Sequence, residues 1–540
     1  MAKPIADREV ESVAFRVVRV LLLGCAFAFP FVLMMGKSIT GDEVVHIPAG
    51  YSYLRTHEIV LNPMHPPLVK ELAALPLLWL RPRIPLDEEK IREIGKREHT
   101  YQWQFGEEFL IGQNVERILF WSRVPAVLIS LGLAIVVTVW ATELWGAAGG
   151  LLALLLYVFD PTITAHAELV TTDVGCAFFS TLFLYLLRRF VRAPSGARLV
   201  TCGGALGLAL GAKFSAVVLV PLAALLLAMN SWNGISGRFR RLLGVAAVHA
   251  VLCALAYATL WALYFFPRNP LFYLAGLHDV ALDHNPGYLH FFMGDFRHGS
   301  WPTYFLVALL IKTPLPELLF MTTAAVLAFC GWRREWREET FVLIPPVAMF
   351  MGYALLASPI GVRYMIPCLP FLLIASGRVG AALAQAPRTV LAVAAALALW
   401  LVAEFAAIWP DHLSYFNEVA GGSRGGVEWL DDSNVDWGQG FLELRRYVRE
   451  NSIHEYRLCN FGYFNPAYYG IDGELVWLDA LLDPPSPGTL ILSAHCVARV
   501  TGWLKSRYGN GPENWLAHLQ PRAIVGHAYW VYEIPARGHP

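Results

Sequence analysis

Two adjacent carboxylates, Asp42 and Glu43, closely follow an apolar run that ends at Met35. They belong to Thr40-Gly41-Asp42-Glu43, which fits a capping box in which Thr40 is the N-cap and Glu43 reaches back to it. In that interpretation Asp42 only favours the positive end of the helix dipole. Ionisable groups at the edge of a bilayer are costly and tend to mark functional paths, so a chemical role is the alternative.

A second predicted helix start also has a carboxylate in its first turn. The loop HAELVTTD precedes another apolar run, so Thr171 or Thr172 begins a helix and Asp173 lies in its first turn. Two caps would explain the two acids separately, but histidines and a further carboxylate accompany them. We therefore favour a shared site over two unrelated caps. The other side chains expected near it are Glu43, His46, His65, His166 and Glu168.

Basic groups stand at similar positions along the chain. Lys213 interrupts a run of small and apolar residues, and Arg363 and Tyr364 in SPIGVRYMIPCLPF begin another apolar run. Lys312 lies inside an apolar segment that Pro314 and Pro316 must kink. Any single cation could simply extend to the membrane surface. Together they favour an anion site, and a lipid phosphate is the natural anion at that depth.

These groups suit the transfer of a sugar from a polyprenyl phosphate. The cations would stabilise the charge that grows on the departing phosphate. A carboxylate would deprotonate the acceptor and deliver it to the anomeric carbon, and this single displacement inverts that centre. The predicted catalytic residues are Asp42 and Asp173, and the predicted substrate-binding residues are Glu43, His46, His65, Lys213, Arg363 and Tyr364.

The composition indicates a protein that crosses a membrane many times. Of 540 residues, 56% are hydrophobic and 16% charged, against about 25% charged in soluble domains. Each spanning helix needs about 20 apolar residues. The net charge is zero, so the chain lacks the excess of basic residues that is typical of nucleic-acid-binding proteins. The first apolar run has no cleavage signal, so it is predicted to be retained. We predict eleven spans, near 14–35, 118–141, 144–160, 172–190, 197–212, 214–230, 242–265, 303–330, 340–357, 364–380 and 389–409.

Lysine and arginine in short loops predict the orientation. One side collects the basic residues, while the short loop DPTITAHAELVTTD has none. The N-terminus is therefore predicted to be cytoplasmic, with the long loop 36–117 and the C-terminus outside. Within that loop, residues 68–80 suit a helix at the membrane interface, and the charged stretch that begins at 87 suits a solvated helix. The basic residues are Arg16, Arg19, Arg188, Arg189, Arg192, Arg198, Arg238, Arg240, Arg241, Arg333, Arg334, Arg337 and Arg388.

From Pro410 the chain becomes richer in Asp, Asn, Gly and Pro. We predict a transmembrane catalytic domain over 1–410 and a soluble outer α/β or α+β domain over 411–540. Cys459 and Cys496 both fall in the second, where an oxidising compartment permits a disulfide, and their pairing is left open.

The segment DDSNVDWGQG begins like a calcium-binding loop. Asp431, Asp432, Asn434 and Asp436 supply oxygens, but no Gly-x5-Glu completes an EF-hand. A packed turn is the preferred interpretation. Substrate contact by Trp437 and Gln439 is the alternative.

The order of motifs resembles a known family. These motifs are the acidic Asp42-Glu43, HPPL from His65, Asp173 at a span start, Lys213 after a glycine-rich span, and RYMIPCLP from Arg363. The set is similar to the GT-C membrane glycosyltransferases, specifically the group with protein O-mannosyltransferases and the lipid A aminoarabinose transferase. His46 stands where relatives often have Tyr, and Met64-His65 where some have Glu or Lys.

The resemblance implies an inverting transferase that uses polyprenyl-phosphate sugars on the outer face of the bacterial cytoplasmic membrane. It implies Asp42 as the base or acceptor-binding acid and Asp173 as the second acid, with Lys213 and Arg363 near the phosphate. The expected partners are a lipid-linked donor, an unidentified protein, glycan or lipid acceptor, and membrane lipids, with no nucleic acid.

Two rival functions stay open. A transporter or flippase would also need charges within the membrane, but usually has inverted halves, which the sequence does not display. A metal-dependent enzyme of the oligosaccharyltransferase type could hold a divalent cation with Asp42, Asp173 and a histidine. No cofactor is predicted, with a divalent cation as the alternative.

Overall fold

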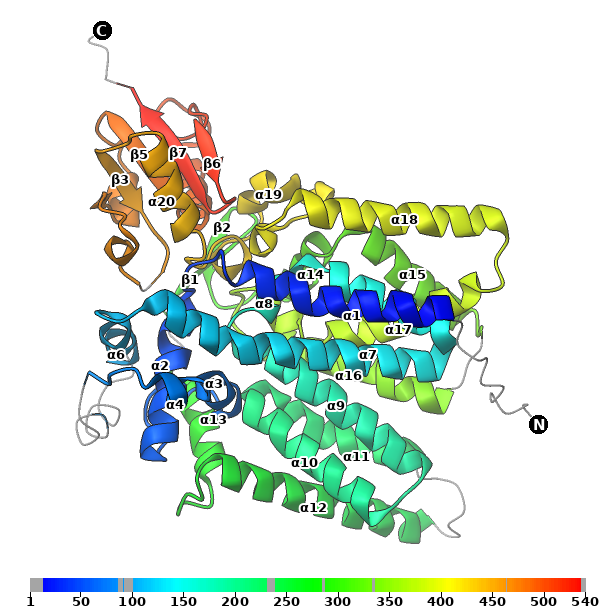
Figure 1. Cartoon of the computed structure of the whole chain (residues 1–540). Helices are drawn as coiled ribbons and strands as arrows, with labels where there is room; N and C mark the ends of the chain where they lie inside the picture. The colour runs from blue at the N-terminus through cyan, green and yellow to red at the C-terminus, as the bar shows by residue number, and fades with distance from the viewer. Residues whose placement is uncertain are drawn as a thin grey trace.

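The fold is mostly helical, with one small sheet at one end (Figure 1). The structure is a computed structural model and describes residues 13–85, 91, 101–230, 238–283, 287–332, 336–462 and 464–535. Arg333 and Arg334 of the predicted cytoplasmic side, and the charged stretch 87–100 apart from residue 91, lie outside the described residues.

Six described helices are long and apolar enough to cross a membrane. A bent pair of helices would make a seventh span, and three shorter apolar helices accompany them. The prediction of several apolar helices of spanning length is thereby confirmed, while the count of eleven stays a prediction. The six are α1 (Val13–Leu33), α7 (Val115–Phe159), α9 (Thr172–Arg192), Leu242–Leu263 of α12 (Arg238–Leu263), α16 (Trp336–Leu356) and α18 (Arg388–Ala407); the shorter ones are α10 (Gly196–Ala212), Phe214–Asn230, which comprises η1 (Phe214–Val218) and α11 (Leu219–Asn230), and α17 (Leu369–Leu383).

The bent pair is α14 (Tyr304–Lys312) and α15 (Leu315–Phe329), whose axes differ by 115°. The break falls at Thr313-Pro314, as the two prolines predicted. Proline lacks the N–H that would continue the helix, so α14 ends before it. Lys312, the last residue of α14, is buried and donates to the Leu413 and Asn434 carbonyls at 2.7 Å each. It therefore holds the C-terminal segment instead of reaching the membrane surface.

The 45 residues of α7 cover both predicted spans, 118–141 and 144–160, as two helices that meet at a kink. A straight helix of that length would measure about 67 Å, roughly twice the hydrocarbon core. Gly146 interrupts it with φ 78° and ψ −178°, a conformation that glycine adopts without a steric penalty. Beyond the break, a Cβ on Gly149 would lie 2.7 Å from the Gly377 carbonyl oxygen, so only glycine permits this close packing of α7 on α17.

The loop between α1 and α7 folds into short helices, which are α2 (Gly41–Thr56), α3 (Leu68–Ala74), α4 (Leu77–Leu80) and α6 (Tyr101–Leu110). The interfacial helix predicted over 68–80 is therefore two helices with a break before Pro76. The remaining helical elements named below are α8 (Pro161–Ala167), α13 (Phe272–Asp283), η2 (Val362–Met365), α19 (Gly422–Gly425), α20 (Phe441–Glu450) and α21 (Ala494–Tyr508).

The C-terminal sheet has five strands in the order β4-β3-β5-β7-β6. Strand β3 pairs in parallel with β4 and β5, whereas β7 pairs antiparallel with β5 and β6. A separate hairpin of β1 and β2 lies earlier in the chain. The strands are β1 (Leu289–Phe292), β2 (Asp295–His298), β3 (Tyr456–Cys459), β4 (Glu474–Leu475), β5 (Gly488–Ser493), β6 (Ala523–Val525) and β7 (Tyr529–Ile534).

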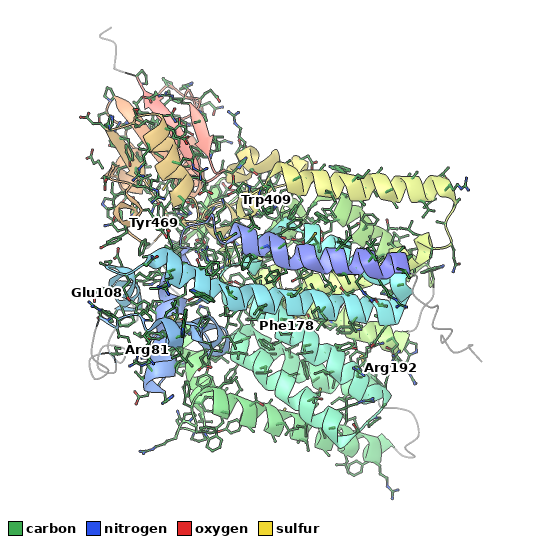
Figure 2. The ribbon with its side chains drawn as sticks, in the orientation of Figure 1. Arg81, Glu108, Phe178, Arg192, Trp409 and Tyr469 are labelled. Atoms are coloured by element: carbon green, nitrogen blue, oxygen red, sulfur yellow. The ribbon has the colours of Figure 1, made fainter. Side chains whose placement is uncertain are left out.

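The two ends of the helical bundle differ. The start of α1 and the start of α18 lie at one end, and the sheet lies at the opposite end (Figure 1). Figure 2 labels Arg192 at the end away from the sheet. Part of the basic set that predicts the cytoplasmic side is thus gathered at one end. The orientation of the termini across a membrane stays a prediction.

Candidate active site

The first acid lies where the sequence predicted it, at the start of α2. Asp42 is in the first turn of α2, and its Oδ2 accepts a hydrogen bond from Arg363 Nη1 at 2.6 Å. Arg363 lies on η2, 321 residues further along the chain. The Asp42 side chain is 20% exposed and that of Arg363 12%. This ion pair therefore retains limited access from outside.

The second acid forms a matching pair. Asp173, in the first turn of α9, accepts from Lys213 Nζ at 2.5 Å. Lys213 stands between α10 and η1, where extended backbone interrupts the helical run. Lys213 Nζ lies 4.4 Å from the centroid of the Tyr364 ring, and the Arg363 guanidinium carbon lies 5.7 Å from it. The Tyr364 ring thus joins the two ion pairs into one cluster.

The C-terminal segment supplies the aromatic neighbour of this cluster. The guanidinium carbon of Arg363 lies 4.3 Å from the Trp437 ring centroid, a cation–π distance. The backbone carbonyl of Trp437 accepts from Gly41 N at 3.0 Å. The backbone N–H of Trp437 donates to Gln439 Oε1 at 2.6 Å. A Cβ on Gly41 would approach Trp437 Nε1 to 2.9 Å. Trp437 therefore lies at the site, and Gln439 holds its backbone.

Glu43, next to Asp42, is buried and paired with an arginine. Its carboxylate accepts from Arg123 Nε at 2.8 Å and from Arg123 Nη2 at 2.6 Å. It also accepts from Thr40 N, completing the capping box, and from Val170 N. Burial alone would raise the pKa of Glu43, but Arg123 and these hydrogen bonds hold it below its usual range. With no exposed surface and both oxygens engaged, Glu43 supports the site from the interior of the fold.

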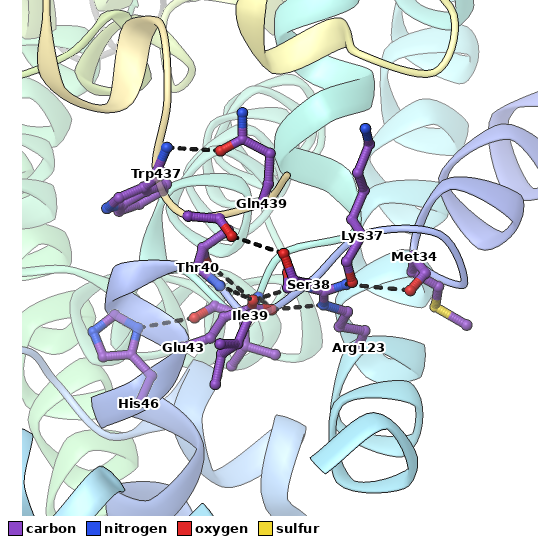
Figure 3. A network of polar contacts seen from close by, with 12 residues as sticks. Met34, Lys37, Ser38, Ile39, Thr40, Glu43, His46, Arg123, Trp437 and Gln439 are labelled. Carbon is purple, nitrogen blue, oxygen red and sulfur yellow. Dashed lines mark hydrogen bonds and ion pairs between the residues drawn. The ribbon is translucent and has the colours of Figure 1, made fainter. Parts of the chain in front are cut away.

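Arg123 is the residue that the sequence analysis missed. Besides Glu43 it donates to the carbonyls of Met34, Lys37 and Ser38 at 3.2, 3.0 and 2.8 Å (Figure 3). These bonds fix the turn between α1 and α2, and hence the position of Asp42. An arginine inside an otherwise apolar span was the available signal, because a charge there needs a buried partner.

The two histidines of the first loop are close to each other. The rings of His46 and His65 are 5.2 Å apart, and His46 Nδ1 lies 2.9 Å from the Val170 carbonyl oxygen. Burial lowers the pKa of His46, although Asp42 opposes this, and burial lowers the pKa of His65 well below its usual value. Both imidazoles are therefore neutral at neutral pH. Lys70 secures the His65 loop by donating to the His65 carbonyl at 2.7 Å.

The DDSN segment is a packed turn that supports η2. Asn434 Oδ1 accepts from Val362 N at 2.8 Å, and Ser433 Oγ donates to the Ile360 carbonyl at 2.9 Å. Both contacts hold the backbone just before Arg363 and so help to position it. Asp431 accepts from Arg499 Nε at 2.8 Å. Among the described residues, no group of three or more His, Cys, Asp and Glu side chains is arranged to hold a metal ion.

The cluster has a definite chemical capacity. Its two carboxylates and two cations balance each other, so an incoming anion must compete with Asp42 for Arg363 or with Asp173 for Lys213. A carboxylate that loses its cation gains proton affinity. The same event that binds an anion therefore prepares a base beside it.

Two comparisons with known proteins concern the fold and the family resemblance. Residues 110–261 match the family model for dolichyl-phosphate-mannose-protein mannosyltransferase. The fold is similar to that of ArnT from Cupriavidus metallidurans bound to undecaprenyl phosphate, with a TM-score of 0.51, 15% identity, and coverage of 98% of this chain and 100% of that one. The chain resembles the GT-C glycosyltransferases. The matches indicate a glycosyltransferase and confirm the resemblance seen in the motifs.

Weaker similarities carry no argument about this chain. The Archaeoglobus fulgidus oligosaccharyltransferase in the apo form gives a TM-score of 0.47 at 12% identity, covering 93% of this chain and 72% of that one. The Saccharomyces cerevisiae protein O-mannosyltransferase Pmt1-Pmt2 complex gives 0.33 at 17%, covering 48% and 36%. A search of curated protein sequences gave no significant match.

Proposed function

We propose that this chain transfers a sugar from a polyprenyl-phosphate donor to an acceptor, with inversion at the anomeric carbon. The transfer takes place on the outer face of the bacterial cytoplasmic membrane, with the N-terminus in the cytoplasm. The observation that supports it most directly is the cluster of two acid–cation pairs around Tyr364. Each pair offers a cation for phosphate and, beside it, a carboxylate for an acceptor proton.

Arg363 and Lys213 bind the donor phosphate. A polyprenyl-phosphate sugar carries one negative charge on its phosphate, and its departing polyprenyl phosphate carries two. Arg363 offers several N–H donors to the phosphate oxygens, and Lys213 offers a point charge, so both stabilise the charge that grows during departure. Trp437 and Asn434 keep the Arg363 side chain and its helix in place.

Asp42 takes the proton. Once the donor phosphate engages Arg363, the Asp42 carboxylate is free to accept the proton of the acceptor hydroxyl or amine. The acceptor atom forms its bond to the anomeric carbon as the bond from that carbon to the phosphate oxygen breaks, with its electron pair leaving on the phosphate. Attack and departure occur on opposite faces, which inverts the centre. Asp173 keeps Lys213 oriented until the phosphate arrives.

The function is tested by following the donor. The purified full-length chain is incubated with lipid extracts that contain polyprenyl-phosphate sugars, and mass spectrometry measures the conversion of each to polyprenyl phosphate. Arg363→Ala should reduce conversion at least about a hundredfold, because a buried phosphate charge is left unpaired. Arg378→Ala is the matched control. Arg378 forms an ion pair with Glu339, with Nη2 and Oε1 2.7 Å apart, and this pair is not part of the cluster.

Two results would contradict the proposal. The first is that the wild-type chain consumes no polyprenyl-phosphate sugar in any extract. The second is that Arg363→Ala and Arg378→Ala reduce conversion equally, which would mean that Arg363 matters only for folding.

A further inference from the structure

A hollow lies apart from the Asp42 cluster, between α20, which belongs with the five-stranded sheet to the C-terminal part of the chain (the sheet unit), and the ends of α1 and α7 nearest to it. Its volume is about 690 Å³, within the range of about 300–1,000 Å³ that small-molecule sites occupy. One side is formed by α20 and the floor by the two membrane helices. Figure 2 labels Tyr469, one of its lining residues, at the junction of the sheet unit and the helical bundle.

The α20 side of this groove is basic. Arg445, Arg446 and Arg449 line it from a single turn of the helix, and Arg445 and Arg449 share one face because they are four residues apart. None of the three forms a salt bridge with any residue that the structure describes. Arg445 is half-buried, whereas Arg446 and Arg449 are exposed, so the guanidinium groups are available to a ligand in the groove.

The other charges of the groove do not neutralise it. Lys37 also lines it, but its ammonium group is held by Asp411 at 2.5 Å and Glu443 at 2.6 Å. The carboxylates that line the groove are Glu116 and Glu450. Three arginines thus face two acids, and an anion with several oxygens would satisfy their N–H donors.

The floor of the groove is apolar and continues onto the membrane surface. Met34 and Met35 at the end of α1, with Leu119 and Phe120 of α7, form it. Met35 is 55% exposed. Phe120 contacts Trp121 edge to face, with their ring centroids 5.4 Å apart.

An aromatic row extends from this floor. Trp121 contacts Trp79 with ring centroids 5.9 Å apart, and Trp79 is 70% exposed. Exposed tryptophans gather where a membrane protein meets the lipid headgroups. The groove therefore opens at the headgroup level, with its arginines on the aqueous side and its apolar floor toward the hydrocarbon.

We propose that this groove binds an anionic membrane lipid. The lipid phosphate contacts Arg445, Arg446 and Arg449, and an acyl chain follows Met35 and Phe120 into the bilayer. A bound lipid would tie α20, and with it the sheet, to the ends of α1 and α7. The site is separate from the donor cluster and does not depend on the transferase activity.

The experiment measures lipid binding directly. Phosphatidylglycerol and phosphatidylcholine are titrated in mixed micelles against the purified full-length chain, and native mass spectrometry counts the bound lipids. The triple variant R445A/R446A/R449A should bind phosphatidylglycerol on the order of a hundredfold more weakly. Each arginine near an anionic headgroup contributes a similar electrostatic free energy, and the losses of the three add up to that factor. R424A/R507A/R522A removes the same charge from exposed positions outside the groove and should bind as the wild type does.

A second variant guards against misfolding. Arg446 and Arg449 are exposed, so R446E/R449E leaves the buried part of α20 intact and should also lose binding. The proposal is overturned if both triple variants lose binding equally, because general surface charge would then be responsible. It is also overturned if the wild type binds phosphatidylcholine equally well, or if inorganic phosphate displaces the lipid at equal concentration.

Discussion

The substitution Asp42→Asn separates catalysis from helix capping. The capping box is made by Thr40 and Glu43, so Asn at position 42 leaves it intact. The change removes one charge from a pair with Arg363 whose side chains are 20% and 12% exposed. After allowance for solvent screening, we expect a stability loss of about 1–2 kcal/mol, seen as a fall of a few degrees in melting temperature.

The effect on transfer should be much larger. Asn keeps the shape of Asp but cannot take a proton, so the turnover number should fall at least about a hundredfold, equivalent to about 2.7 kcal/mol in the barrier. Donor affinity should stay the same or increase, because Asp42 no longer competes with the phosphate for Arg363. The assay measures the transfer rate over a range of donor concentration, together with a melting curve for each variant.

Glu43→Gln is the matched control. It leaves the Arg123 guanidinium buried without its carboxylate, and we expect a loss of about 3–5 kcal/mol. Its folded fraction should nevertheless retain turnover. Normal turnover in Asp42→Asn, or a collapse of donor affinity with turnover unchanged at saturation, would refute the assignment of Asp42 as the base.

Three further predictions concern protonation, metal dependence and thiols. Burial raises the pKa of Glu168 from 4.5 to about 8, so the folded chain holds a proton there that the unfolded chain releases, and stability falls as pH rises from about 4.5 to about 8. Glu168→Gln should therefore match the wild type in melting temperature at pH 5 and exceed it at pH 9, whereas a constant difference would place the titration elsewhere. Because Arg363 and Lys213 supply the cations, transfer should persist in EDTA, and a rate restored only by added Mg²⁺ or Mn²⁺ would favour the metal-dependent alternative. Cys459 Sγ lies 2.7 Å from Cys496 Sγ, so protein from an oxidising compartment should carry them as a disulfide in peptide mass spectra, and alkylation of both thiols without prior reduction would contradict this.

The sequence alone predicted which acids and cations belong to the candidate site. Paired acids at helix starts and cations at similar depth predicted Asp42, Asp173, Lys213 and Arg363, because a charge beside lipid is costly unless it has a partner or a function. The proline break in span 303–330 was predictable for a local reason, since proline cannot donate the next helical hydrogen bond.

The tertiary structure decided which acid meets which cation. Asp42 pairs with Arg363 across 321 residues of chain, and no local pattern encodes that contact. It also decided that Arg123 pairs with the Glu43 carboxylate. The sequence shows Arg123 as a single charge in an apolar run but does not show which residue is its partner. Finally, the DDSN turn supports η2 only because the chain folds back onto the membrane helices. Such pairings depend on packing between distant segments, whereas caps and breaks depend on neighbours along the chain.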